Sequence, residues 1–171
     1  HFLSMQQPPL LPEETLVRVL RLAKFDGLGA VVLGTLFALM SAVSGDVSFA
    51  VVGLLAAGAG AIESHGAGLL REGEARGMNW LIASQPFLLL VIWVYCGLRF
   101  THFEMPPLPD GMRELAALSA QQWDMSVEAY FRLLNSITIG VLAVVSLGYQ
   151  GGMTLYYWRR RRPVAQALAE G

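Results

Sequence analysis

Ionisable side chains are rare within the long apolar stretches of this chain, so the few that occur there are the first candidates for chemistry. Glu63 and His65 lie at the end of an uncharged run, where an ionisable group is costly unless it meets a partner or water. Residues two apart on a helix point about 200° apart, so this pair does not converge on one proton or metal ion unless the helix unwinds at Gly66. Glu63 is the carboxylate expected to matter most.

An alternative gives Glu63 and His65 no role beyond anchoring. Both side chains would then lie at the membrane surface, hydrogen-bonded to lipid headgroups or to loop arginines such as Arg71. The other polar candidates are uncharged and lie in other apolar runs. Gln85 precedes Pro86, which frees a backbone carbonyl one turn earlier and can kink a helix, so this position is a candidate pore or ligand lining. The complete set of pore, ligand or partner-binding candidates is Glu63, Ser64, His65, Gln85, Asn135, Tyr149 and Gln150.

No pattern typical of an enzyme or a metal centre occurs. The sequence contains no HExxH motif, phosphate loop or dinucleotide fingerprint. The group formed by His102, Glu104 and Asp110 lacks a recognised ligand spacing, and His65 and His102 fall on opposite sides of a membrane, so they cannot share a haem iron. Cys96 is the single cysteine. We therefore predict a protein that is not an enzyme and that holds no metal and no cofactor.

Four long apolar runs must position these residues. Hydrophobic residues make up 54% of the 171 residues and charged residues only 15%, which is far from the composition of a soluble domain. About 20 apolar residues span a bilayer as a helix. The sequence predicts an all-α membrane protein whose four transmembrane helices form an antiparallel bundle within residues 27–162. The spans are expected at about 27–45, 47–68, 78–100 and 133–158.

The segments outside the spans have separate expected roles. Residues 1–11 are interpreted as a leader, with His1–Ser4 a tag remnant and Met5 the native start. Residues 12–26 predict a basic amphipathic helix lying on the lipid surface, although they also fit the beginning of a longer first span. An exterior loop is expected at 101–132 and a cytoplasmic tail at 163–171.

Within the exterior loop, prolines at 106, 107 and 109 interrupt any helix, and Asp110–Gly111 predicts a turn. A short helix is expected at Met112–Leu118. Asp124 or Ser126, followed by Glu128, predicts the start of a helix that continues into the last span.

Basic residues between the spans predict the orientation. The chain has 12 Lys and Arg residues, and alternate loops place three of them on one side and the rest on the other. Since positive charge is disfavoured on the translocated side, both termini are expected in the cytoplasm of a bacterial inner-membrane protein. The basic residues assigned to the cytoplasmic side are Arg18, Arg21, Lys24, Arg71, Arg76 and Arg159–Arg162.

Small residues predict where helices approach one another. They recur every four residues on span two and again on span four, where they let backbones pack closely. The predicted packing positions are Ala56, Gly60, Gly68, Gly148 and Gly152. This packing takes place either inside one bundle or between copies. Similarity between Ser64–Leu70 and Tyr149–Leu155 raises the alternative that the two hairpins are parallel repeats.

Aromatic residues near the predicted span ends, including Tyr156 and Tyr157, are interpreted as interface anchors. With a net charge of −1 and no basic stripe, nucleic acid is not an expected partner. Two classes of function remain. The first is an oligomeric channel or transporter for an ion or small solute. The second is an accessory or scaffold protein that binds lipid or another membrane protein.

Overall fold

Five α-helices make up the described part of the chain. The computed structural model describes residues 11–103 and 109–170. All helices except the fourth are long and apolar enough to cross a membrane, which confirms the all-helical prediction and the four apolar helices. The bounds are α1 (Pro12–Val43), α2 (Val47–Arg71), α3 (Gly77–Thr101), α4 (Asp110–Gln122) and α5 (Val127–Glu170).

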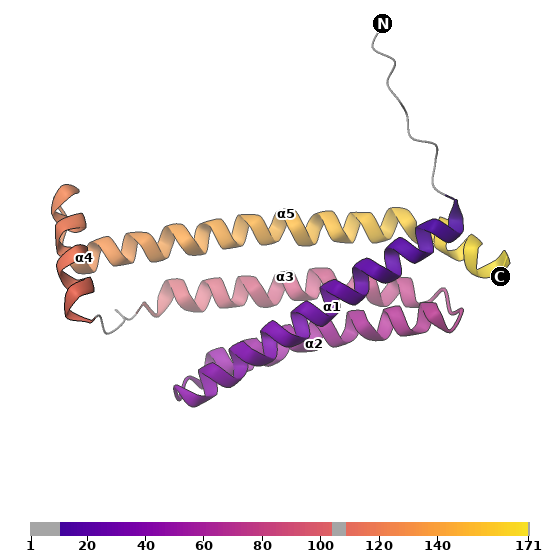
Figure 1. Cartoon of the computed structure of the whole chain (residues 1–171), viewed down its shortest axis with the longest axis horizontal. Helices are drawn as coiled ribbons and strands as arrows, with labels where there is room; N and C mark the ends of the chain where they lie inside the picture. Colours follow the sequence, from indigo (N-terminus) through magenta and orange to yellow (C-terminus); the bar gives the residue numbers. More distant parts are fainter. Residues whose placement is uncertain (1–10, 104–108, 171) are drawn as a thin grey trace, which may run out of the picture.

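The long helices lie roughly side by side, as Figure 1 shows. The α1–α2 turn and the α2–α3 turn lie at opposite ends of the molecule, α5 runs along α3, and α1 crosses the others obliquely. The short helix α4 lies across the far end, next to the start of α5. The most extensive packing is between α1 and α2, and α3 packs against both α2 and α5.

Local sequence explains several helix ends. Asp46 accepts a hydrogen bond from the backbone nitrogen of Phe49 at 3.1 Å, which satisfies one free donor at the start of α2. Gly45 adopts the left-handed backbone conformation that the tight turn between α1 and α2 requires, with φ of 79°. Ser126 caps α5 by accepting from the nitrogen of Ala129 at 3.2 Å, which confirms Ser126 as the predicted helix start.

The structure differs from the expected segment boundaries at three places. The residues expected to form a separate surface helix are the first half of α1, which runs without interruption through Asp26. The predicted turn at Asp110–Gly111 is wrong, because these residues form the first turn of α4. The expected tail is helical to Glu170, with Pro163 inside α5. Residues 1–10, 104–108 and 171, which include most of the leader and Glu104, lie outside the described residues.

Glycines bring α1 and α2 into backbone contact. A Cβ atom at Gly34 would lie 2.5 Å from the nitrogen of Ala57, and one at Gly53 would lie 2.6 Å from the nitrogen of Ala38. Gly60 meets the backbone of Gly27 in the same way. Such close approach gains dispersion contacts where no hydrophobic drive exists. The remaining predicted packing glycines, Gly68, Gly148 and Gly152, border open space.

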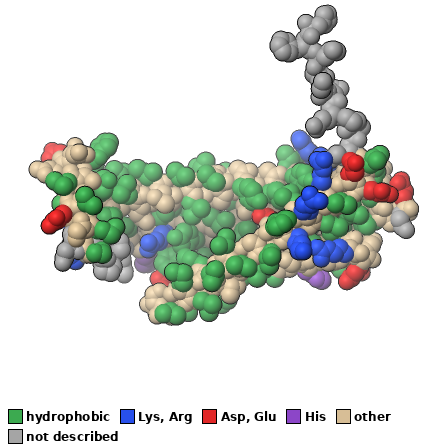
Figure 2. Space-filling model, in the orientation of Figure 1, with side chains coloured by type: hydrophobic (Ala, Val, Ile, Leu, Met, Phe, Trp, Pro, Cys, Tyr) green, Lys and Arg blue, Asp and Glu red, His purple; other side chains and the backbone are tan. Residues whose placement is uncertain are grey.

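The largest cluster of buried side chains lies at one end of the molecule. Val19, Leu70, Met78, Tyr157 and Val164 are at most 1% exposed and form one cluster contributed by all four long helices. Elsewhere large apolar side chains cover the surface, and Figure 2 shows them along the whole length, while Lys and Arg gather where α1 begins and α5 ends. This distribution is compatible with a membrane-embedded protein.

Candidate functional site

Each of the four long helices contributes to one group of polar side chains beside the tightly packed end. Asp26 comes from α1, Glu63 from α2, Gln85 from α3, and Tyr149 and Tyr157 from α5. These five residues are called the polar cluster below. The cluster unites residues that are far apart in the sequence, since Asp26 and Tyr149 are separated by 123 positions.

Hydrogen bonds link the members of the polar cluster. The Tyr157 hydroxyl donates to Glu63 Oε1 at 2.6 Å, and these two side chains are 0% and 1% exposed. Gln85 Nε2 donates to Asp26 Oδ2 at 3.0 Å, and the Tyr149 hydroxyl donates to Asp26 Oδ1 at 3.0 Å. The Glu63 carboxyl group also faces Asp26 and Gln85. The two carboxyl groups therefore belong to one connected site.

The small residues of α1 explain why Asp26 lies beside Glu63. Gly27 follows Asp26, and a Cβ atom at Gly27 would lie 3.0 Å from the carbonyl oxygen of Gly60 and 2.9 Å from Ser64 Oγ. The two helices are therefore in close contact next to the two carboxylates, as they are around Gly34 and Gly53. A larger residue at position 27 would move α1 away and separate Asp26 from Glu63.

The charges of the polar cluster are not balanced by basic groups. Within residues 11–103 and 109–170, the ion pairs are those of Arg76 with Glu74 and Arg132 with Glu128, so neither Asp26 nor Glu63 has a basic partner. Their three hydrogen-bond donors, two phenols and one amide, are neutral. Burying a carboxylate without a counter-charge is expensive, so such a site favours the uptake of a positive charge.

Two buried amide oxygens add to the excess of acceptors. Gln85 Oε1 and Gln150 Oε1 have no hydrogen-bond partner among the described residues, and the two side chains are 0% and 5% exposed. A buried acceptor without a partner normally costs about 1–3 kcal/mol. Gln85 therefore presents an unsatisfied oxygen within the same amide group whose nitrogen holds Asp26.

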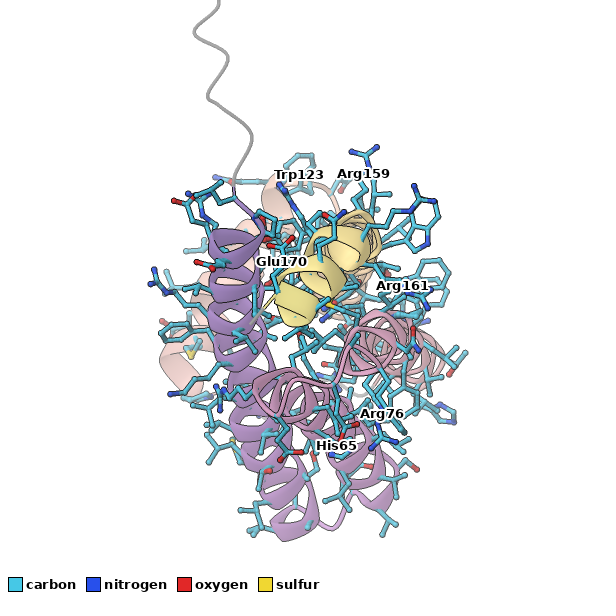
Figure 3. The ribbon with its side chains drawn as sticks, turned by 90° about the vertical axis from the view of Figure 1, so that its right-hand side faces the viewer. His65, Arg76, Trp123, Arg159, Arg161 and Glu170 are labelled. Atoms are coloured by element: carbon cyan, nitrogen blue, oxygen red, sulfur yellow. The ribbon has the colours of Figure 1, made fainter. Side chains whose placement is uncertain are left out.

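Two of the other sequence candidates, His65 and Asn135, lie elsewhere, while Ser64 is exposed but lies against Gly27, next to Asp26. His65 is exposed on α2, and its ring lies against that of Trp80 with 5.4 Å between centroids. Figure 3 shows His65 and Arg76 together on the α2–α3 side of the bundle. Asn135 donates to the carbonyl oxygen of Arg99 at 3.4 Å, far along α5 from Tyr149. The structure thus brings together Glu63, Gln85 and Tyr149, with Gln150 buried next to them in the chain.

Two members of the polar cluster were missed by sequence reasoning. The sequence places Asp26 at the border of the first apolar run, whereas α1 continues through it. The prediction of Tyr157 as an interface anchor is wrong, because its side chain is fully buried. The available signal was periodicity: Tyr157 lies seven residues after Gln150, which puts both on one face of a helix.

An apolar groove begins about one helical turn from the polar cluster, and its lining includes none of the five cluster residues. It has a volume of about 430 Å³ and is lined by residues of α1, α2, α3 and α5. Ala30 of the lining follows Asp26 by one helical turn, Leu88 follows Gln85 by three residues, and Leu142 precedes Tyr149 by two turns. Leu33, at the rim, is 69% exposed, so the groove opens toward the apolar surface of the molecule.

The site has the chemistry of a cation or hydrogen-bond donor site. Within the part of the chain that the structure describes, no three His, Cys, Asp or Glu side chains form a group suited to a metal ion. The polar cluster instead offers two carboxyl groups, two phenols and the amide oxygen of Gln85 among apolar helices. The chain matches no protein-family model, no curated protein and no solved structure.

Proposed function

We propose that this protein is an inner-membrane transport protein in which the polar cluster holds an ion or small solute on its way across the bilayer. The observation that carries this proposal is the convergence of Asp26, Glu63 and Gln85, with two tyrosines, from four apolar helices. A scaffold that only packs against another protein needs no such group. Ionisable residues inside apolar spans typically mark substrate or ion pathways.

The depth of the polar cluster supports the same proposal. Glu63 lies eight residues before Arg71, and Gln85 lies eight residues after Gly77, so both are about 12 Å from the α2–α3 turn. In the proposed topology, with antiparallel spans and both termini in the cytoplasm, this turn is cytoplasmic. The site then lies within the inner half of the bilayer.

Assembly of several copies is part of the proposal, because one bundle of four helices is too narrow to enclose a water-filled path. Gly148 and Gly152 border open space on α5, and a second copy can pack there as helices do at small-residue faces. The small-residue face of α2 is already occupied by α1 around Gly60.

Flux measurements on liposomes test the proposal. Liposomes that contain the protein and an internal pH dye are expected to dissipate an imposed proton gradient faster than protein-free liposomes, alone or after a monovalent cation is added outside. Glu63→Gln should abolish the difference, because the amide keeps the volume and loses the charge. Glu72→Gln is the matched control, since Glu72 is exposed at the end of the same helix. Equal dissipation with and without protein contradicts the proposal.

An accessory or scaffold function is the second candidate, and the apolar groove favours it. A groove open to the apolar surface and lined by side chains such as Leu33 and Leu142 fits a lipid chain or a partner helix. In that case Glu63→Gln should leave both partner binding and ion flux unchanged.

A further inference from the structure

The polar cluster lacks hydrogen-bond donors and positive charge. Two carboxyl groups, those of Asp26 and Glu63, have no basic partner within the described ranges. Gln85 Oε1 and Gln150 Oε1 are buried without a donor. Among the five residues of the polar cluster, the buried atom without a partner is an acceptor, Gln85 Oε1, and its complement beside two carboxyl groups is a cationic group that carries N–H donors.

The surroundings of the site specify the rest of such a ligand. The groove begins one turn from Asp26, at Ala30, and continues past Leu88 and Leu142. Its volume of about 430 Å³ lies within the range of small-molecule sites, about 300–1,000 Å³. A ligand that fills both parts has a small cationic head and an apolar body, and it can enter from the lipid side past Leu33.

We propose that the polar cluster and the groove together bind an amphiphilic amine in its protonated form. An alkylammonium group carries three N–H donors, which match the carboxyl groups of Asp26 and Glu63 and the amide oxygen of Gln85. Its hydrocarbon chain occupies the groove lined by α1, α2, α3 and α5. The inference rests on the proposed transport function and names the class of its substrate.

Three probes with the same dodecyl group distinguish the contributions of charge, hydrogen bonding and apolar burial to binding. The protein is placed in nanodiscs of phosphatidylcholine, and binding of dodecylammonium, dodecyltrimethylammonium and dodecanol is measured by titration calorimetry against empty nanodiscs. Dodecylammonium is expected to bind saturably. Dodecyltrimethylammonium, which has the charge without the donors, should bind about tenfold more weakly, and dodecanol should show only partition into lipid.

Substitutions assign the binding to the two parts of the site. Asp26→Asn and Glu63→Gln should each weaken dodecylammonium binding about tenfold to a hundredfold, while Glu72→Gln should leave it unchanged. Ala56→Leu, which narrows the groove without touching the polar cluster, should weaken dodecylammonium several-fold and leave hexylammonium unaffected. Ala56→Leu keeps the test decisive if a carboxyl variant fails to fold.

The outcomes separate this inference from the transport proposal. Ion flux that depends on Glu63 without saturable amine binding overturns the inference and leaves transport standing. Saturable amine binding without flux supports the inference and removes transport. Dodecanol binding equal to that of dodecylammonium, or amine binding unaffected by both carboxyl substitutions, shows that the groove accepts only hydrocarbon and overturns the inference.

Discussion

Burial distinguishes Glu63 from the exposed carboxylates at the ends of the helices. Its side chain is 1% exposed, and one carboxyl oxygen accepts the Tyr157 hydroxyl at 2.6 Å. Since Tyr157 is itself fully buried, no solvent can replace its hydroxyl. The pair is therefore a fixed contact between α2 and α5.

Tyr157→Phe is expected to destabilise the protein by about 1–3 kcal/mol, because a buried acceptor loses its donor while the ring remains in place. Thermal unfolding in detergent measures the change. Tyr156→Phe is the matched control, since Tyr156 is only partly buried and its ring contacts Arg160. An unchanged midpoint for Tyr157→Phe would show that the hydroxyl contributes nothing to folding.

For individual residues, the sequence predicts which side chains are site candidates but does not predict which of them contact one another. Glu63, Gln85 and Tyr149 are noticeable because polar groups inside apolar runs are few. Their partnership depends on the rotation and crossing of four helices, which no spacing within one helix encodes. Asp26 is not predicted as a site residue, because a charged residue directly before an uncharged run is typical of a membrane border.

Among the elements, the contact between α1 and α2 is sensitive to side-chain size along its length. Gly60→Ala and Gly68→Ala, eight residues apart on α2, make a matched pair. A Cβ atom at Gly60 would lie 2.7 Å from the nitrogen of Val31, whereas one at Gly68 meets nothing within 4 Å. Gly60→Ala should lower the free energy of unfolding by about 1–3 kcal/mol through overpacking, and Gly60→Leu should lower it further.

Gly68→Ala should leave stability unchanged or raise it by up to about 1 kcal/mol, because alanine favours the helix over glycine. Thermal unfolding of the two alanine variants in the same detergent provides the comparison. Equal midpoints would mean that α1 separates from α2 without cost and that the close approach at Gly60 does not stabilise the fold.

The elements themselves are the best-predicted level of this structure. Uncharged runs of about 20 residues predict helices, because a helix in a bilayer satisfies its own backbone hydrogen bonds. Helix ends are predicted where a specific capping residue occurs, as at Ser126. The helix start at residue 12 is predicted as well, but the continuity of α1 through Asp26 is not, because the sequence assigns the polar groups of its charged first half equally well to a lipid surface.

For the whole molecule, the orientation in the membrane remains a prediction from charge. With Cys96→Ser as background, a cysteine at Ala165 on α5 should resist an impermeant thiol reagent in intact cells, and one at Gln122 on α4 should react. Both positions are exposed in the structure. Labelling at Ala165 together with protection at Gln122 would invert the proposed topology.

The partners of Asp26 carry a consequence for biogenesis. Tyr149 follows Asp26 by 123 positions and Tyr157 follows Glu63 by 94, so α1 and α2 emerge from the ribosome long before their hydrogen-bond donors on α5 exist. A charged residue at the centre of an inserting helix costs about 2.5–3.5 kcal/mol. Until α5 inserts, the hairpin of α1 and α2 holds two carboxyl groups in the bilayer without these donors. We expect quality-control proteases to recognise this state. A chain truncated before Val127 should be degraded quickly in cells, and Asp26→Asn together with Glu63→Gln should lengthen its lifetime.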